Sequence, residues 1–358
     1  MADRRRIAIV GCGFIGGVHS MVLRGLIRTG AVDAQVVATC DSDLGRAQLY
    51  AMSHGAEVST ADPAIAMAAA DVVWVCTPTA THRELIHIAA ANGNAAYCEK
   101  PLAPNIEDAE ALVAEAEDAG IPVQVGLVLR HSPALAAMAD LLREGAIGRP
   151  MAAVLRDDQY FPIQGQYAST WRSDVSVAGG GTLIEHSIHD LDLLGWLLGP
   201  VAGVGAGTAN FAGHDGIEDV ATAILRHQGG ATSSLTSVWH AILSRPSTRR
   251  LEVLCERGMM WTDDENLGPV TLLTDSGTRE LPNLVTPGRS ELIGEVVEAL
   301  ELPAIFHGPL ASYVLADLAF LEALDAGTDP FPGLDEALTA HRIVEAVYRS
   351  ATEPFTML

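Results

Sequence analysis

Lys100 is the only lysine in this chain, and it is the first residue whose type points to chemistry. Of the 22 lysines and arginines, the other 21 (22 minus 1) are arginines. An arginine stays cationic at any accessible pH, whereas burial or neighbouring charges can bring the pKa of an ammonium towards neutrality. One lysine can survive by chance, but Lys100 follows Glu99 directly after the apolar run 95–98, which predicts a strand. Because open α/β sheets bind ligands beyond the carboxyl ends of their strands, we expect Lys100 in an active site.

A glycine motif follows the first predicted strand and opens a helix; its residues are Gly11, Cys12, Gly13, Phe14, Ile15 and Gly16. Such glycines permit a tight turn, close approach of the backbone to a pyrophosphate, and close packing of a helix whose amino terminus attracts the anion. Asp41 ends the second predicted strand, where a carboxylate binds ribose hydroxyls and repels a 2′-phosphate. The pattern predicts an NAD site, with NADP second; the alternative is a glycine-rich turn with an unrelated acidic cap.

A second group of chemical residues follows the glycine run 179–181. Glu185 and His189 are spaced so that a continuous helix places them on one face, where the carboxylate can orient the imidazole. Such a histidine suits proton transfer near neutral pH. His186 and Asp190 have the same spacing, but they do not share one face with His189, so we predict no metal site. The alternative is a solvated polar face whose leucines supply the core.

Composition limits the class of protein. A chain of 358 residues is expected to form two domains, and 49% hydrophobic with 19% charged residues predicts a large core. The formal net charge of -23 argues against nucleic acid or an anionic membrane as partner. The five cysteines show no paired close spacing, which predicts buried thiols in a reducing compartment. The short apolar run 7–10 is no signal sequence and no apolar run spans a bilayer, so we expect a cytoplasmic protein.

The elements that must position these residues follow two patterns. Alanine-rich helices alternate with short β-rich runs, which is typical of a doubly wound parallel sheet. These predicted strands are 7–10, 36–39, 72–75, 95–98 and 123–127. After residue 126 the pattern predicts an α+β domain on a mostly antiparallel sheet. Its expected elements are a helix at 133–143, a strand at 152–160, several strands between 201 and 274, and amphipathic helices near 307–325 and 334–350.

The ordered set of motifs resembles the glucose-fructose oxidoreductase / inositol dehydrogenase (Gfo/Idh/MocA) family over essentially the whole chain. Beside the glycine motif, the matching features are Cys76-Thr77-Pro78 with His82, Glu99-Lys100-Pro101, and the glycine-rich turn before Glu185 and His189. The resemblance implies an NAD-binding Rossmann domain, expected at 1–126. It also implies a substrate-binding and oligomerisation α+β domain with a large open sheet, expected at 127–358.

The resemblance further implies an NAD-dependent enzyme that transfers hydride between nicotinamide and a hydroxyl or carbonyl carbon of a sugar or cyclitol. Lys100 corresponds to the active-site lysine and His189 to the general acid/base, while Glu185 stands where an aspartate is usual. Arg130 corresponds to an arginine that binds substrate oxygens. The implied cofactor-binding residues are Gly11, Gly13, Phe14, Ile15, Gly16, Asp41, Thr77, Pro78, His82, Glu99 and Lys100.

Further substrate-binding candidates lie at predicted strand ends or loops: Tyr160, Trp171, Arg172 and His240. Aromatic and polar side chains suit a polyol, although a capped turn, an ion pair or a buried aromatic edge would explain them equally. In the expected oxidation His189 accepts the hydroxyl proton and Lys100 stabilises negative charge on the reacting oxygen. The two side chains are therefore expected to face one another across the domain cleft.

Two other classes of function stay open. One is an NAD-dependent glycoside hydrolase on the same fold, which would consume no net NAD, and the other is a non-catalytic dinucleotide sensor. The presence of Lys100, Glu185 and His189 together argues against the sensor. The resemblance also implies a homo-oligomer, dimer or tetramer, while the sequence leaves the sugar and the reaction direction open.

Overall fold

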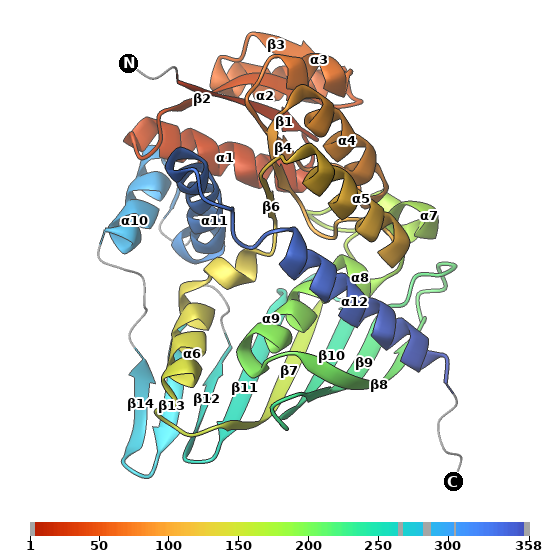
Figure 1. Ribbon diagram of the computed structural model, residues 1–358, viewed down its shortest axis with the longest axis vertical. Coiled ribbons are helices and arrows are strands. Elements are labelled where there is room, and N and C mark those ends of the chain that lie inside the picture. Colours follow the sequence, from red (N-terminus) through yellow and green to blue (C-terminus); the bar gives the residue numbers. More distant parts are fainter. Residues whose placement is uncertain (1–3, 264–267, 282–287, 304–305, 354–358) are drawn as a thin grey trace. The chain divides into compact units, whose positions relative to one another are not determined.

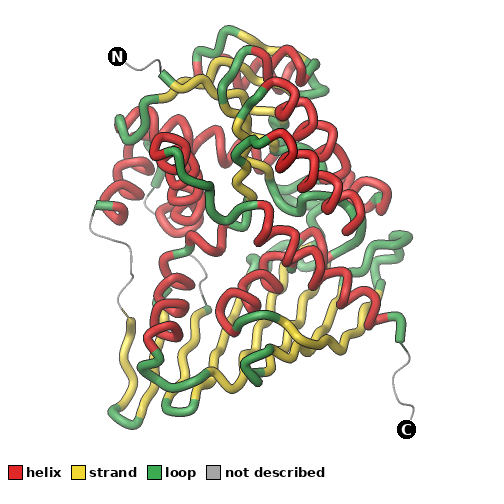
Figure 2. Tube along the Cα trace, in the orientation of Figure 1, coloured by secondary structure: helices red, strands yellow, loops and turns green. Residues whose placement is uncertain are grey.

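The computed structural model describes residues 4–263, 268–281, 288–303 and 306–353, which divide into two compact units (Figures 1 and 2). The first unit comprises the chain up to residue 128 together with 286–338, and the second comprises 129–285 together with the chain from 339. None of the helices in the described ranges combines the length and apolar character needed to span a bilayer.

The first unit contains a parallel six-stranded sheet in the order β3-β2-β1-β4-β5-β6. Its strands are β1 (Arg5–Val10), β2 (Ala34–Cys40), β3 (Val58–Thr60), β4 (Val72–Val75), β5 (Ala95–Cys98) and β6 (Val123–Val125). The intervening helices are α1 (Phe14–Thr29), α2 (Leu44–His54), α3 (Pro63–Ala68), η1 (Thr79–Thr81), α4 (His82–Asn92) and α5 (Ile106–Ala119). The order reverses between β1 and β4, which is where doubly wound sheets bind dinucleotides. The predicted Rossmann fold is confirmed.

Local chemistry explains these elements. Every residue of β4 and β5 is buried, as expected for strands covered on both faces. Asp43 and Asn105 cap α2 and α5 by accepting backbone N–H bonds, and Asp62 caps α3 beside a proline in its first turn. These caps fix the residues at which the helices after β2, β3 and β5 begin.

The segment 288–338 differs from the prediction, which placed it in the carboxyl-terminal domain. Its helices α10 (Arg289–Ala299) and α11 (His307–Ala326) pack against α1, where a Cβ on Gly25 would come within 2.6 Å of Val296. Phe320 joins the core of β1 and β4. Helix α11 is also not amphipathic as predicted: buried residues lie around its whole circumference, because it is enclosed in the first unit.

The second unit contains an eight-stranded sheet in the order β14-β13-β12-β11-β7-β10-β9-β8, antiparallel except for the β7–β10 pair. Its strands are β7 (Pro150–Tyr160), β8 (Val201–Ala209), β9 (Val220–His227), β10 (Thr232–His240), β11 (Thr248–Cys255), β12 (Gly258–Thr262), β13 (Val270–Thr274) and β14 (Gly277–Leu281). Its helices are η2 (Val128–His131), which begins at the last residue of the first unit, α6 (Pro133–Glu144), η3 (Thr170–Ser173), α7 (Val175–Ala178), α8 (Thr182–Glu185), α9 (Ile188–Leu198) and α12 (Leu334–Ala351), of which residues from 339 belong here. This large antiparallel sheet confirms the predicted fold class.

One face of this sheet carries the core. Along β9, Ala221, Ala223 and Leu225 are buried and belong to the same apolar cluster as residues of α6, α9 and α12, while Ile224 between them points outward and is 63% exposed. The alternation is that of a sheet covered on one side. The other face therefore presents its side chains to solvent within this unit.

Glu218, just before β9, ties the start of α8 to α12. Its carboxylate accepts the backbone N–H groups of Gly181 at 2.8 Å and Leu183 at 2.9 Å, and the hydroxyl of Tyr348 at 3.0 Å. A Cβ on Gly181 would lie 1.8 Å from the Glu218 carbonyl oxygen, so only glycine permits this approach. The contact fixes the glycine-rich turn that precedes Glu185 and His189.

We expect Glu218→Ala to lower the free energy of unfolding by about 1–3 kcal/mol, because buried N–H groups lose their acceptor. Urea unfolding of the full chain measures this loss. Asp215→Ala, at an exposed position in the same loop, is the control and is expected to stay within about 0.5 kcal/mol of the parent. An equal stability of the Glu218→Ala variant and the parent would show that the tie contributes nothing.

Candidate active site

The glycine motif forms a loop between β1 and α1 whose glycines have different roles. Gly11 has φ +97°, and a Cβ there would lie 2.5 Å from the Cys76 carbonyl carbon. A Cβ on Gly16 would lie 1.9 Å from the Gly11 oxygen, so that glycine brings the helix against the strand. A Cβ on Gly13 would meet no described atom within 4 Å, and the amino terminus of α1 has no side-chain cap. The open space beside Gly13 and the uncapped amino terminus of α1 lie where a pyrophosphate would bind, and the loop fits NAD.

Asp41 follows β2 and adjoins this loop. Its carboxylate accepts the N–H groups of Cys12 and Asp43, both at 2.8 Å. Arg46, in α2, is exposed and its Nε lies 3.6 Å from the Asp43 carboxylate. Arg46 is thus a basic side chain near this edge of the sheet, but the carboxylate of Asp41 is the group that bonds the glycine loop.

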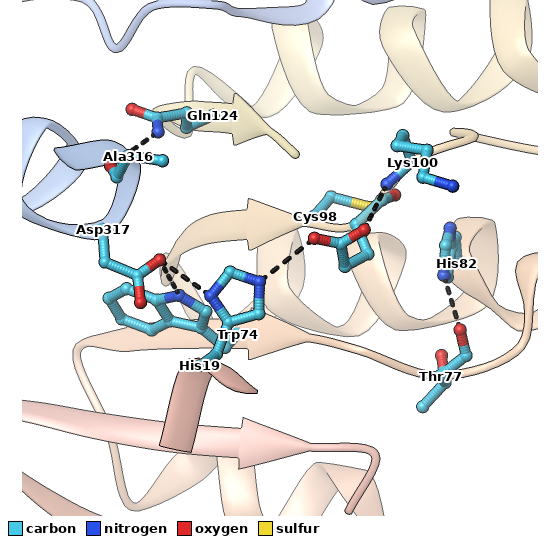
Figure 3. Close-up of polar contacts among 10 residues, drawn as sticks. His19, Trp74, Thr77, His82, Cys98, Lys100, Gln124, Ala316 and Asp317 are labelled. Atoms are coloured by element: carbon cyan, nitrogen blue, oxygen red, sulfur yellow. Dashed lines mark hydrogen bonds and ion pairs between the residues drawn. The ribbon is translucent and has the colours of Figure 1, made fainter. Parts of the chain in front are cut away.

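Thr77 and Pro78 follow β4, and His82 joins their loop to the one after β5. The His82 ring is buried, with Nδ1 2.8 Å from the Pro101 oxygen. Its Nε2 lies 2.9 Å from the Thr77 oxygen (Figure 3). These contacts make His82 a support for two loops at the sheet edge. Its direct contact with the cofactor stays a prediction, as do those of Thr77, Pro78, Ile15 and the exposed Phe14.

Lys100 follows β5 at the same edge of the sheet, two residues after the last strand residue. Its side chain is half-buried, and its backbone N–H donates to the buried Glu99 carboxylate at 3.2 Å. Glu99 in turn contacts His19, which contacts Asp317. Neither His19 nor Asp317 was predicted as a site residue: His19 stands three residues after Gly16 on a buried face of α1, and no local signal marks Asp317.

Glu185 lies in the second unit and corrects the expected helical pair. Helix α8 ends at Glu185, the backbone at His186 leaves the helical region, and α9 begins only at Ile188. The expectation that Glu185 and His189 lie one turn apart in a continuous helix is therefore wrong. Instead the buried Glu185 carboxylate accepts Nε of Arg172 at 3.0 Å, and the Arg172 guanidinium lies over the Trp171 ring at 4.3 Å.

His189 is half-buried in the first turn of α9, beside a buried ionic cluster. Arg249 bridges Asp190 at 2.6 Å and Asp157 at 2.7 Å, and Nε2 of His186 lies 2.7 Å from Asp157. Burial raises the pKa of Asp190 to about 7, although the Arg249 guanidinium opposes this rise. The cluster fixes the first turn of the helix that carries His189.

Arg130 and His240, which were predicted to bind substrate, both contact other residues of this chain. Arg130 donates both Nε and Nη2 to Asp192, at 2.9 and 2.8 Å, and lies 5.6 Å from the Trp196 ring centroid. Nδ1 of His240 accepts the Ile242 N–H at 3.2 Å, while Nε2 lies 3.5 Å from Asp158.

The Tyr160 ring lies 5.4 Å from that of Tyr167. The roles of Arg130, Tyr160, Trp171, Arg172 and His240 in substrate binding stay predictions. In the described part of the chain no group of three or more His, Cys, Asp or Glu residues has metal-binding geometry.

Family models match both parts of the chain. Residues 5–127 match the oxidoreductase family with an NAD-binding Rossmann fold, and residues 135–261 match the GFO/IDH/MocA C-terminal domain.

Three relatives are named dehydrogenases or reductases. D-apiose dehydrogenase of Paraburkholderia graminis is 35% identical over 63% of this chain and only 58% of its own length. 1,5-Anhydro-D-fructose reductase of Ensifer adhaerens is 31% identical over 70% of this chain and 76% of its own length. Inositol 2-dehydrogenase of Rhizobium meliloti is 26% identical over 97% of both chains.

A solved oxidoreductase from Agrobacterium radiobacter, in complex with NAD+, L-tartaric acid and magnesium, has the same fold. It is 25% identical with a TM-score of 0.79, and the alignment covers 98% of this chain and 97% of that one. The fold, the glycine loop and these matches agree, and this chain belongs to the Gfo/Idh/MocA family of NAD-binding oxidoreductases.

Proposed function

We propose that this protein oxidises a hydroxyl carbon, or reduces a carbonyl carbon, of a sugar or cyclitol with NAD. The observation that carries the proposal is the position of Lys100, which follows β5 at the same sheet edge as the glycine loop after β1. An ammonium at this edge stands where a substrate beside the cofactor needs a charged donor. The names of the relatives supply the substrate class.

The glycine loop and the start of α1 would hold the pyrophosphate of NAD, and Asp41 the adenosine ribose. The bound cofactor supplies the hydride chemistry. Lys100 donates a hydrogen bond to the reacting oxygen and stabilises the negative charge that develops there. His189 exchanges the proton of the same hydroxyl, which requires that the two side chains reach one substrate.

The remaining side chains orient the substrate. Glu185 and Arg172 form an ion pair next to the Trp171 ring, a combination that binds hydroxyl groups and a ring face. We assign Arg130, Tyr160 and His240 to the substrate hydroxyl groups that do not react. Because the relatives are named dehydrogenases and reductases, we favour net redox over glycoside hydrolysis.

We also propose that copies of this chain associate through the open face of the second sheet. One row across it contains Ile224, Ser234 and Val154, and a neighbouring row contains Leu254 and Leu273; four of these five are large exposed apolar residues. Large exposed apolar residues gathered on one face of a sheet favour an interface there. A cytoplasmic location is consistent with the five cysteines, which are buried free thiols.

A substrate panel tests the function. The purified protein is incubated with NAD+ and myo-inositol, scyllo-inositol, D-apiose or 4-nitrophenyl glycosides, while NADH and released nitrophenol are both recorded. We expect NADH from a sugar or cyclitol, and tighter binding of NAD than of NADP because of Asp41. Nitrophenol without net NADH would instead establish the hydrolase, and tighter NADP binding would overturn the cofactor preference.

Replacing Lys100 by arginine should lower kcat on the order of a hundredfold or more, because a planar guanidinium cannot reproduce one compact donor at the reacting oxygen. Steady-state kinetics with the best panel substrate measures the loss. The affinity for NAD and the Tm are expected to stay close to those of the parent. Turnover at the parent rate would show that Lys100 supplies charge alone or takes no part.

Ile224→Glu should reduce the mass of the assembly in solution, because it places a charge at an exposed apolar position of the proposed interface. Light scattering coupled to gel filtration measures the mass. Ile242→Glu is the matched control, since Ile242 is 55% exposed but follows β10 in a loop. An unchanged mass of the Ile224→Glu protein would place the interface elsewhere.

A further inference from the structure

We infer that His19, held by Asp317, is a positioning residue that fixes the carboxylate of Glu99 and through it the backbone of Lys100. The inference deepens the proposed function and rests on it, because it assigns a support to the lysine proposed to act on substrate. All four residues belong to the first unit. His19 lies on α1, Glu99 and Lys100 follow β5, and Asp317 lies on α11.

The contacts form an unbroken chain. Oδ1 of Asp317 lies 2.8 Å from Nδ1 of His19 and accepts the indole N–H of Trp74 at 3.2 Å (Figure 3). Nε2 of His19 lies 3.1 Å from Oε1 of Glu99, and Oε2 of Glu99 accepts the backbone N–H of Lys100 at 3.2 Å. The two carboxylate oxygens of Glu99 therefore have different partners: Oε1 contacts the His19 ring, and Oε2 accepts the backbone N–H of Lys100.

The charge state follows from the partners. Both ring nitrogens of His19 face carboxylate oxygens, and only an imidazolium can donate to two acceptors. Burial alone lowers the pKa of His19, but the carboxylates of Asp317 and Glu99 outweigh it and raise this pKa to about 10. His19 is therefore cationic at neutral pH, and its bonds to Glu99 and Asp317 are charge-assisted.

The carboxylate of Glu99 has no room to move. A Cβ on Gly126 would lie 2.6 Å from Oε1 and 2.9 Å from Cδ of Glu99, so the carboxylate fills the space that glycine leaves. The His19 ring is itself packed between Tyr97, at 4.8 Å, and Tyr313, at 5.6 Å between centroids. Steric and polar contacts thus define one position for Glu99.

Stability alone does not explain this cluster. His19 and Asp317 are 0% exposed and Glu99 is 5% exposed. Oδ2 of Asp317 is buried with no hydrogen-bond partner in the described part of the chain. Removing such charges from water is costly, and apolar side chains of similar volume often serve a core as well or better. We attribute the retained charges to their effect on the loop of Lys100, whose backbone N–H donates to the Glu99 carboxylate.

Three variants test the inference. His19→Gln removes the imidazolium, Asp317→Asn removes the negative charge that faces it, and Gly126→Ala displaces the Glu99 carboxylate while every charge remains. His54→Gln is the matched control, because Nε2 of His54 bonds Ser20 on the same helix α1 at 2.7 Å. Tm and NAD+ binding confirm that each protein is folded, and Gly126→Ala keeps the test open if the charge variants fail to fold.

The first readout needs no substrate. Because the chain has one lysine, protein labelled with [ε-13C]lysine gives a single signal, from Lys100. We expect this signal to move or broaden in His19→Gln, Asp317→Asn and Gly126→Ala and to stay in place in His54→Gln. An identical signal in all four variants and the parent would overturn the positioning role.

The second readout is kinetic. His19→Gln and Gly126→Ala are expected to lower kcat at least tenfold with the best panel substrate, since small displacements of an active-site group cost up to about a hundredfold. Affinity for NAD should change little. In a Lys100→Met background the further loss from His19→Gln should vanish, because residues that act through one another are not additive.

The outcomes separate the two proposals. If the parent forms no NADH with any panel substrate, the proposed function fails. If Lys100→Met turns over at the parent rate, the catalytic role of Lys100 fails, and the positioning role of His19 fails with it. If Lys100→Met is slow but His19→Gln lowers its residual rate by the same factor as in the parent, only the positioning role fails.

Discussion

The contact between His19 and Asp317 joins parts of the chain that are 298 residues apart. It requires α11 to pack against the parallel sheet and to place a buried carboxylate within the apolar core of β1, β4 and β5. With Asp317 in place, His19 remains cationic, Glu99 has a buried counter-ion, and the loop after β5 has a fixed start. The proposed position of Lys100 depends on this constraint.

Each unit carries a distinct part of the proposed chemistry. The first provides the glycine loop, Asp41 and Lys100 at the carboxyl ends of neighbouring strands. The second provides His189 at the start of a helix that Arg249 and its two carboxylates hold in place. In both units a member of a buried ionic cluster adjoins the residue proposed to react: Glu99 precedes Lys100, and Asp190 follows His189.

The sequence predicted those features that depend on local patterns. Gly11, Asp41 and Lys100 each come after a run of buried residues that predicts a strand. Their common position at one edge of the parallel sheet could therefore be predicted. The prediction of one continuous helix through Glu185 and His189 was wrong, because i, i+4 spacing presumes an unbroken helix and the backbone leaves the helical region at His186. Asp317 and the return of 288–338 were not predictable, because a helical pattern does not say which of two cores it joins.

The central claim, redox at a hydroxyl carbon, is tested most directly by following the hydrogen on that carbon. A substrate from the panel, deuterated at the reacting carbon, is incubated with NAD+, and the products are examined by mass spectrometry. The account predicts slower turnover than with the unlabelled substrate and recovery of the deuterium in the reduced cofactor. Deuterium that is lost to water, or retained in a product formed without reduced cofactor, would contradict it.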